Sequence, residues 1–138
     1  MPFVLDASVA VCWAFVDEDS ALADQALDRV RTDHAVVPSL FWFEVWNVLL
    51  VNERRGRIAE ADTADILADL FRLGVVIDQD MHPASVLDLA RRHRLTAYDA
   101  SYLELARRLE APLATLDQRL ARAAQSENVA LLDDSPPC

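Results

Sequence analysis

The chain has 138 residues, of which 53% are hydrophobic, so it suits one folded domain with a buried core and is not a disordered protein. The formal net charge is −10 at pH 7, and every basic residue is arginine, which fits a site that gathers cations or a basic partner better than a typical nucleic-acid binder. The two glycines, Gly56 and Gly74, cannot form a P-loop, a G-x-G-x-x-G motif or a G-x-S-x-G elbow, so those nucleotide and hydrolase sites are excluded.

The alternation of apolar runs and amphipathic segments predicts the elements. In chain order we expect a strand at 3–6, helices at 7–16 and 19–33, a strand at 35–38, a helix capped by Ser39 and stopped by Gly56, a helix at 59–74, a strand at 75–78, helices at 82–94 and 96–111, a strand at 112–117, a helix at 118–127 and a strand at 129–132. Short strands rich in Val, Leu and Ile between helices indicate a parallel sheet covered on both faces. We expect one domain over 1–138, with 133–138 as a flexible tail.

Neither cysteine nor histidine residues have a metal-ligand spacing. Cys12 and Cys138 lie far apart, which favours a reducing compartment. The apolar stretch 7–16 follows Asp6, has no basic residues before it and is too short to cross a bilayer. We therefore expect a soluble cytoplasmic protein that does not enter the membrane.

Two acidic residues stand where predicted strands end. Asp6 follows the first strand and Asp117 follows the fourth, so both lie at the same edge of a parallel sheet. Sites in such sheets lie outside the carboxyl ends of the strands. The alternative, which is the commoner role for either residue taken alone, is that each merely caps the next helix.

Two further acids lie on apolar helices. Glu44 sits in "SLFWFEVWNVLL" with Asn47 on the same face, which indicates a carboxylate with a hydrogen-bonding support. Asp99, in "LTAYDASYLELA", falls on the apolar stripe with Leu103 and Ala106 four and seven positions later. A buried carboxylate is costly unless it is paired or binds a metal. A half-exposed polar stripe remains the alternative for Glu44, and a dipole-stabilising first-turn residue for Asp99.

The segments "VLDASVAV", "FWFEVWNVL", "LTAYDASYLELA" and "LATLDQRLARAA", in this order over nearly the whole chain, resemble the PIN-domain ribonucleases, and among them the VapC-type toxins of toxin–antitoxin pairs. The resemblance implies an α/β/α sandwich around a central parallel five-stranded sheet. It places the family's acidic quartet at Asp6, Glu44, Asp99 and Asp117, with Ser8, Asn47 and Thr115 as supporting residues.

The residue types fit a hard divalent cation. Four carboxylates without a nearby His or Cys cluster suit Mg²⁺ or Mn²⁺ rather than Zn²⁺. Such a cation can activate water and orient a phosphate, which is the chemistry of RNA cleavage. We expect Asp6 and Asp99 to bind the principal metal, with Glu44 and Asp117 completing the site directly or through water.

The expected partners follow in part from the resemblance. It implies a VapB-like antitoxin whose basic residues reach the acidic site, and an RNA substrate. The candidate RNA-binding patches are the arginine clusters at 54–57, at 91–94 and at 107–108. The alternative for each cluster is a solvated helix end, where arginine suits the helix dipole, and we prefer that alternative for Arg107 and Arg108. We also expect a homodimer. One buried stripe of a helix cannot use all of Phe41, Trp42, Phe43 and Trp46, so some of them should form an exposed patch, and such patches commonly mark interfaces.

Two other functions compete with this interpretation. An aspartyl-phosphate phosphatase also carries an Asp after its first strand, but it needs a second Asp where Ser8 stands and a lysine that the chain lacks. A catalytically silent PIN-like module that only binds a partner protein remains the alternative, although the four acids argue against decay of the site. A metal-dependent nuclease assay separates these functions.

Overall fold

The computed structural model describes residues 1–15 and 20–132. In this part the chain forms a parallel four-stranded sheet in the order β3-β2-β1-β4. The strands are β1 (Phe3–Leu5), β2 (Ala35–Pro38), β3 (Val76–Asp78) and β4 (Leu113–Ala114). The helices are α1 (Ala7–Ala14), α2 (Ala21–Val30), α3 (Phe41–Arg54), α4 (Glu60–Arg72), α5 (Pro83–His93), α6 (Ala97–Leu109) and α7 (Gln118–Ser126).

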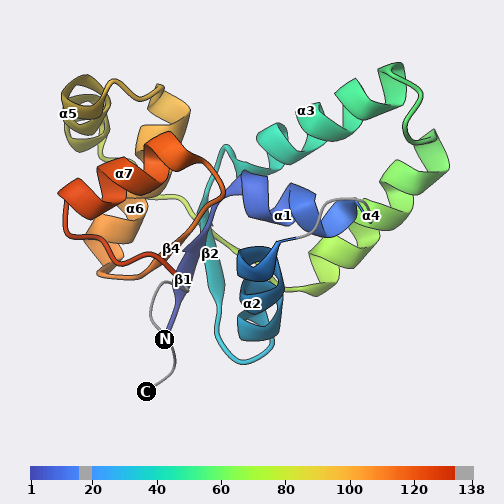
Figure 1. Ribbon diagram of the computed structural model, residues 1–138, viewed down its shortest axis with the longest axis horizontal. Coiled ribbons are helices and arrows are strands. Elements are labelled where there is room, and N and C mark those ends of the chain that lie inside the picture. Colours follow the sequence, from blue (N-terminus) through green and yellow to red (C-terminus); the bar gives the residue numbers. More distant parts are fainter. Residues whose placement is uncertain (16–19, 133–138) are drawn as a thin grey trace.

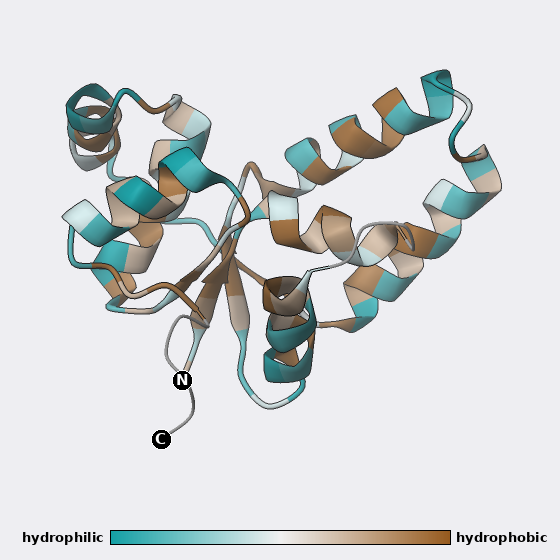
Figure 2. Ribbon diagram, in the orientation of Figure 1, coloured by the Kyte–Doolittle hydropathy of each residue, from teal (hydrophilic) through white to brown (hydrophobic). Residues whose placement is uncertain are grey.

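The helices cover both faces of the sheet. Helices α1 to α4 lie on one side and α5 to α7 on the other, and α3 and α4 together extend away from the sheet as an arm (Figure 1). The strands are apolar (Figure 2), and all of β1 and β4 is buried, whereas Val76 and Ile77 of the edge strand β3 are exposed. This arrangement confirms the predicted α/β fold with a parallel sheet, because strands buried on both faces need a continuous apolar run.

The prediction of a fifth strand at 129–132 is wrong. Residues 129–132 run beside β4, but only Leu131 forms a bridge, with Leu113. Two backbone hydrogen bonds hold it, from the Leu113 amide to the Ala130 carbonyl and from the Leu132 amide to the Leu113 carbonyl, both 2.9 Å long. Strand β4 has two residues and therefore offers no longer ladder to a neighbour.

Strand β4 is short because the backbone amides that follow it donate to side-chain hydroxyl groups and not to a neighbouring strand. The predicted strand at 112–117 ends at Ala114. Beyond it the Leu116 amide donates to Ser8 Oγ at 3.0 Å, and the Asp117 amide donates to Thr115 Oγ1 at 3.0 Å. These contacts turn the chain from the sheet towards α1 and into α7.

Several helices are shorter than predicted; α2, for example, ends at Val30 and not at residue 33. Helix α3 begins at Phe41 after Leu40, and Ser39 lies in the preceding turn, so Ser39 is not its N-cap. Helix α1 ends at Ala14, whereas the predicted end at Val16 and the predicted tail at 133–138 lie outside the described residues. Gly56 does follow α3, with a φ of +74° that suits glycine.

No helix in the described ranges is both long and apolar enough to cross a membrane.

Candidate acidic site at the carboxyl edge of the sheet

The four singled-out acids line one pocket of about 250 Å³ beyond the carboxyl ends of β1 and β4. Asp6 follows β1, Asp117 precedes α7, Glu44 lies in the first turn of α3, and Asp99 lies in the first turn of α6. The pocket walls also include Ser8 and the apolar residues Ala7, Val11 and Val48. Four segments of the chain therefore bring acids to the edge where parallel sheets place their sites.

Asp6 is the most deeply buried of the four acids. It is 5% exposed, and its Oδ2 atom accepts hydrogen bonds from Ser8 Oγ and Thr115 Oγ1, both at 2.7 Å. Although it occupies the N-cap position of α1, its side chain makes no capping bond, so capping does not explain it. Burial raises the pKa of its carboxyl group above the usual range, the two hydroxyl donors oppose that rise, and the charge of Asp117 adds to it.

Ser8 and Thr115 tie the two strand ends together. Each hydroxyl donates to Asp6 and accepts a backbone amide, from Leu116 in the case of Ser8 and from Asp117 in the case of Thr115. The bond between Thr115 and Asp6 joins residues that are 109 positions apart. These two residues thus hold Asp6 in one orientation, which is the supporting position that the resemblance implies for them.

Glu44 is held by a tyrosine that sequence reasoning missed. The hydroxyl of Tyr102, a buried residue of α6, donates to Glu44 Oε1 at 2.6 Å. Burial raises the pKa of Glu44, the tyrosine bond opposes the rise, and the charges of Asp6 and Asp99 reinforce it. Asn47, the expected support, is exposed on α3 and does not line the pocket. The sequence offers one indication of this contact: Tyr102 lies three residues after Asp99 on an otherwise apolar helix face, so its hydroxyl group needs a polar partner.

Asp99 and Asp117 complete the pocket from two helix starts. Thr96 caps α6, since its hydroxyl group accepts a hydrogen bond from the Asp99 amide. The Asp99 carboxylate is therefore not needed to cap this helix. Burial raises the pKa of Asp99, and the charges of Asp117 and Asp6 raise it further. Asp117 does cap its helix, accepting the Leu120 amide at 3.0 Å, so the capping interpretation is right for this residue.

The side-chain positions leave room for a cation held partly through water. In the described ranges no three His, Cys, Asp or Glu side chains are close enough to hold one metal ion as placed. However, Mg²⁺ usually keeps several waters and takes only one or two carboxylates directly. Carboxylates that raise one another's pKa values are relieved by a cation, so the donor set fits Mg²⁺ or Mn²⁺.

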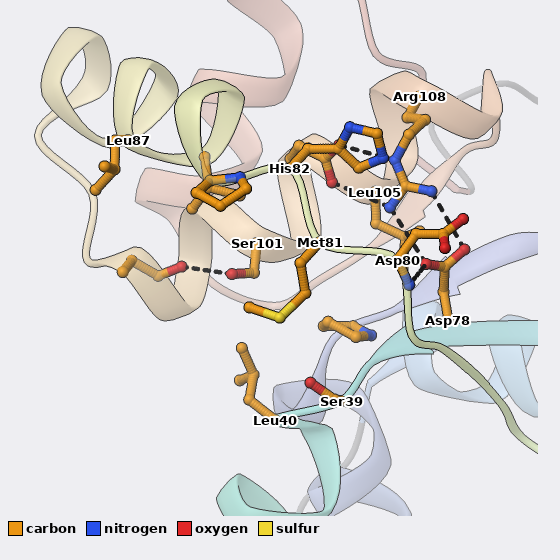
Figure 3. A pocket seen from close by; sticks show the side chains of 15 residues that line it. Ser39, Leu40, Asp78, Asp80, Met81, His82, Leu87, Ser101, Leu105 and Arg108 are labelled. Carbon is orange, nitrogen blue, oxygen red and sulfur yellow. Dashed lines mark hydrogen bonds and ion pairs between the residues drawn. The ribbon is translucent and has the colours of Figure 1, made fainter.

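A second pocket, of about 280 Å³, is built differently (Figure 3). Apolar side chains such as Leu40, Met81 and Leu87 line most of it. Its one arginine, Arg108, is already paired with Glu104 at 2.8 Å and with Asp78 at 3.3 Å. Three acids, Asp78, Asp80 and Glu104, also line it, but Arg108 pairs with two of them, whereas no arginine lines the pocket around Asp6.

Comparisons with known proteins place the chain in one family. Residues 3–126 match the family model of the PIN domain. The chain is 31% identical over 124 residues to Ribonuclease VapC3 of Pyrobaculum aerophilum, an alignment that covers 88% of this chain and 93% of that protein. It also resembles the crystal structure of PAE2754 from Pyrobaculum aerophilum, with 25% identity, a TM-score of 0.70, and coverage of 89% of this chain and 79% of the other. From the sheet order, the acidic pocket and these matches it follows that the chain belongs to the PIN domain family.

Proposed function

We propose that this protein is a metal-dependent endoribonuclease and the toxin component of a toxin–antitoxin pair. The observation that carries the proposal is the set of acids around one pocket, three of which have pKa values raised by burial and by one another. Membership of the PIN domain family and the name of the relative, a ribonuclease, support RNA as the substrate.

Asp6 and Asp99 are the residues that we assign to the principal Mg²⁺ or Mn²⁺ ion, with Glu44 and Asp117 completing its surroundings. When bound, the ion would activate water and neutralise charge on the phosphate. Ser8 and Thr115 keep Asp6 oriented, and Tyr102 does the same for Glu44. Ala7, Val11 and Val48 form apolar walls that limit water around the acids and strengthen their electrostatic interactions.

The purified chain should cleave single-stranded RNA in Mg²⁺ or Mn²⁺ and lose that activity in EDTA, with recovery when excess Mg²⁺ is added back. Gel analysis of an end-labelled RNA measures the rate. Contaminating ribonucleases that need no metal are identified by cleavage that persists in EDTA. Absence of cleavage in either metal would favour the catalytically silent binding module instead.

The same acids supply a rationale for an antitoxin. A VapB-like partner would place an arginine or lysine among the carboxylates, where a guanidinium can pair with two of them. It would compete with the cation for the same oxygens, so each would weaken the binding of the other. This pairing belongs to a cytoplasmic setting, in which the RNA substrate is also present.

We also propose a homodimer centred on an apolar stripe of α3. Phe43, Trp46 and Leu50 are 68%, 39% and 43% exposed, whereas Phe41 and Trp42 are buried. The three exposed residues share one helix face, and the rings of Phe43 and Trp46 are 5.2 Å apart. Exposed aromatic patches of this kind commonly mark interfaces.

Light scattering should give twice the mass of one chain at micromolar concentration. The variant Phe43→Glu/Trp46→Glu should give the mass of one chain, because two desolvated carboxylates oppose the interface. Met81→Glu, at a residue that is 78% exposed elsewhere on the surface, is the matched control and should remain dimeric. A wild-type protein with the mass of one chain would contradict the proposal.

A further inference from the structure

A third pocket, a groove of about 540 Å³, lies between the end of α5 and one face of α7. Its lining consists of His93, Arg94, Arg119, Arg122, Ala123 and Ser126. The four residues from α7 are spaced at i, i+3, i+4 and i+7, so they share one helix face. The groove therefore follows α7 from its first turn towards its last.

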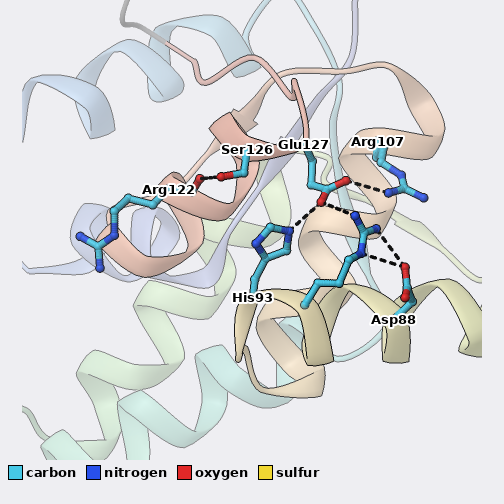
Figure 4. Close-up of polar contacts among 7 residues, drawn as sticks. Asp88, His93, Arg107, Arg122, Ser126 and Glu127 are labelled. Carbon is cyan, nitrogen blue, oxygen red and sulfur yellow. Dashed lines mark hydrogen bonds and ion pairs between the residues drawn. The ribbon is translucent and has the colours of Figure 1, made fainter.

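The groove keeps its positive charge, unlike the arginines that contact Glu127 and Glu104. Arg94, Arg119 and Arg122 are exposed, and none forms an ion pair with an acid in the ranges 1–15 and 20–132. The side chain of Arg122 extends away from the cluster around Glu127 (Figure 4). Three exposed arginines without an ion pair in the described ranges thus line one groove, in a chain with a net charge of −10.

Neighbouring charges are already neutralised. Glu127 accepts from Arg92 at 2.8 Å, contacts His93 Nε2 at 2.6 Å and accepts from Arg107 at 3.0 Å (Figure 4). These partners hold the pKa of Glu127 below its usual range, with the His93 bond as the largest cause. Glu127 is therefore fully paired with these three residues and does not neutralise the arginines of the groove. Arg92 and Arg107, which belong to the clusters noted in the sequence, are engaged there and not in the groove.

The groove opens next to the acidic pocket. Arg119 follows Asp117 by two residues, and Arg94 precedes Asp99 by five. Arg119 is close enough to Asp99 for its charge to lower the pKa of that carboxyl group, against the larger effect of burial. A cation in the first turn of a helix is disfavoured by the helix dipole, so helix stability does not explain Arg119.

We propose that this groove binds the phosphate backbone of single-stranded RNA and leads it to the acidic pocket, with Arg119 holding a phosphate beside the scissile one and Arg122 and Arg94 holding its neighbours. The inference rests on the proposed function. An acidic pocket repels phosphates, and adjacent arginines offset that repulsion. Guanidinium groups bind phosphate oxygens in a bidentate way, and Arg119 and Arg122 are spaced by ~4.5 Å along the helix axis.

Binding can be tested without cleavage. A fluorescein-labelled oligouridylate is titrated with the protein in EDTA, and anisotropy is followed over a series of salt concentrations. The variant Arg119→Gln/Arg122→Gln should bind about 10-fold more weakly at ~100 mM salt, and the slope of log K against log salt should fall by about 1.4, or ~0.7 for each lost phosphate contact. Thermal denaturation confirms that the variant is folded.

Arg54→Gln/Arg55→Gln is the matched control. It removes the same charge from two exposed residues at the far end of α3, away from α7 (Figure 1). These residues belong to the other candidate patch at 54–57, so the control also tests whether that patch binds the RNA. This control should retain the wild-type affinity and salt slope. An equal loss in both variants would mean that net charge alone governs binding, and it would overturn the groove assignment.

Kinetics separates this inference from the proposed function. With Mg²⁺ present, the Arg119→Gln/Arg122→Gln variant should show a KM about 10-fold higher at low salt and a nearly unchanged kcat, because it keeps all four acids. If the wild-type protein cleaves RNA and the variant binds and cleaves equally well, only the groove assignment fails. If the wild-type protein neither binds nor cleaves RNA, both fail. If the Arg119→Gln/Arg122→Gln variant binds polyglutamate more weakly than the wild type does but binds RNA equally well, the groove binds an acidic protein segment and not RNA.

Discussion

Replacing Asp99 by Asn is expected to lower the rate of RNA cleavage by about 1,000-fold while the protein stays folded. Asp99 is one of the two residues assigned to the principal cation, and an amide carries no charge to hold that cation. The helix should persist, because Thr96 rather than the Asp99 side chain caps α6. Single-turnover cleavage in saturating Mg²⁺ gives the rate, and circular dichroism checks the fold.

Asp24→Asn is a closely matched control for this substitution. Asp24 lies in the first turn of α2, as Asp99 does in α6, and Ser20 caps α2 just as Thr96 caps α6. Both changes remove one acid from the start of a capped helix, but only Asp99 lines the acidic pocket. Asp24→Asn should cleave RNA at the wild-type rate. Wild-type activity in Asp99→Asn would remove the basis for the metal-dependent mechanism.

The metal-free protein is expected to become less stable as the pH rises above the ordinary carboxyl range of about 4. Asp6, Glu44 and Asp99 all have pKa values raised on folding, chiefly by burial. Between the unfolded and folded pKa values the native state holds more protons than the unfolded chain, so the free energy of unfolding falls with rising pH. Each unit of such a rise corresponds to about 1.4 kcal/mol.

Other carboxyl groups act in the opposite direction but at lower pH. The pKa values of Asp33 and Glu127 are lowered, by the N-terminal amine and by His93 respectively as the largest causes. Their contribution is present above the unfolded pKa and is lost as the pH falls through the lowered values, below about pH 4.5. Above about pH 5 these two groups are ionised in both the folded and the unfolded state, so they do not oppose the loss of stability that the acidic pocket causes there.

Asp6→Asn provides the matching test of this stability effect. Its amide oxygen can still accept from Ser8 or Thr115, while the buried charge is gone. In EDTA near pH 8 the variant should melt several degrees above the wild type, since ~1 kcal/mol shifts Tm by roughly 4 °C in a domain of this size. Saturating Mg²⁺ should raise the Tm of the wild type and close the difference. A wild-type Tm that climbs with pH in EDTA would contradict the account.

The order of elements and the positions of two acids were readable in the sequence because they depend on local patterns. Apolar runs between amphipathic segments predicted the parallel α/β fold, which the structure and the PIN domain match confirm. Asp6 and Asp117 end predicted strands, and parallel strands deliver their carboxyl ends to one edge. Glu44 and Asp99 stood out because a carboxylate on an apolar helix face requires a partner.

Contacts between distant segments were decided only by the tertiary structure. The Tyr102 bond to Glu44 spans 58 residues and the Thr115 bond to Asp6 spans 109, and no periodicity in the sequence encodes such pairs. The residues at 129–132 have the composition of a strand, yet the brevity of β4 leaves them one bridge. Likewise, all arginines look alike in sequence. Packing alone decides that Arg92, Arg107 and Arg108 meet acids while Arg94, Arg119 and Arg122 face an open groove, because charge compensation depends on which helix surfaces come together.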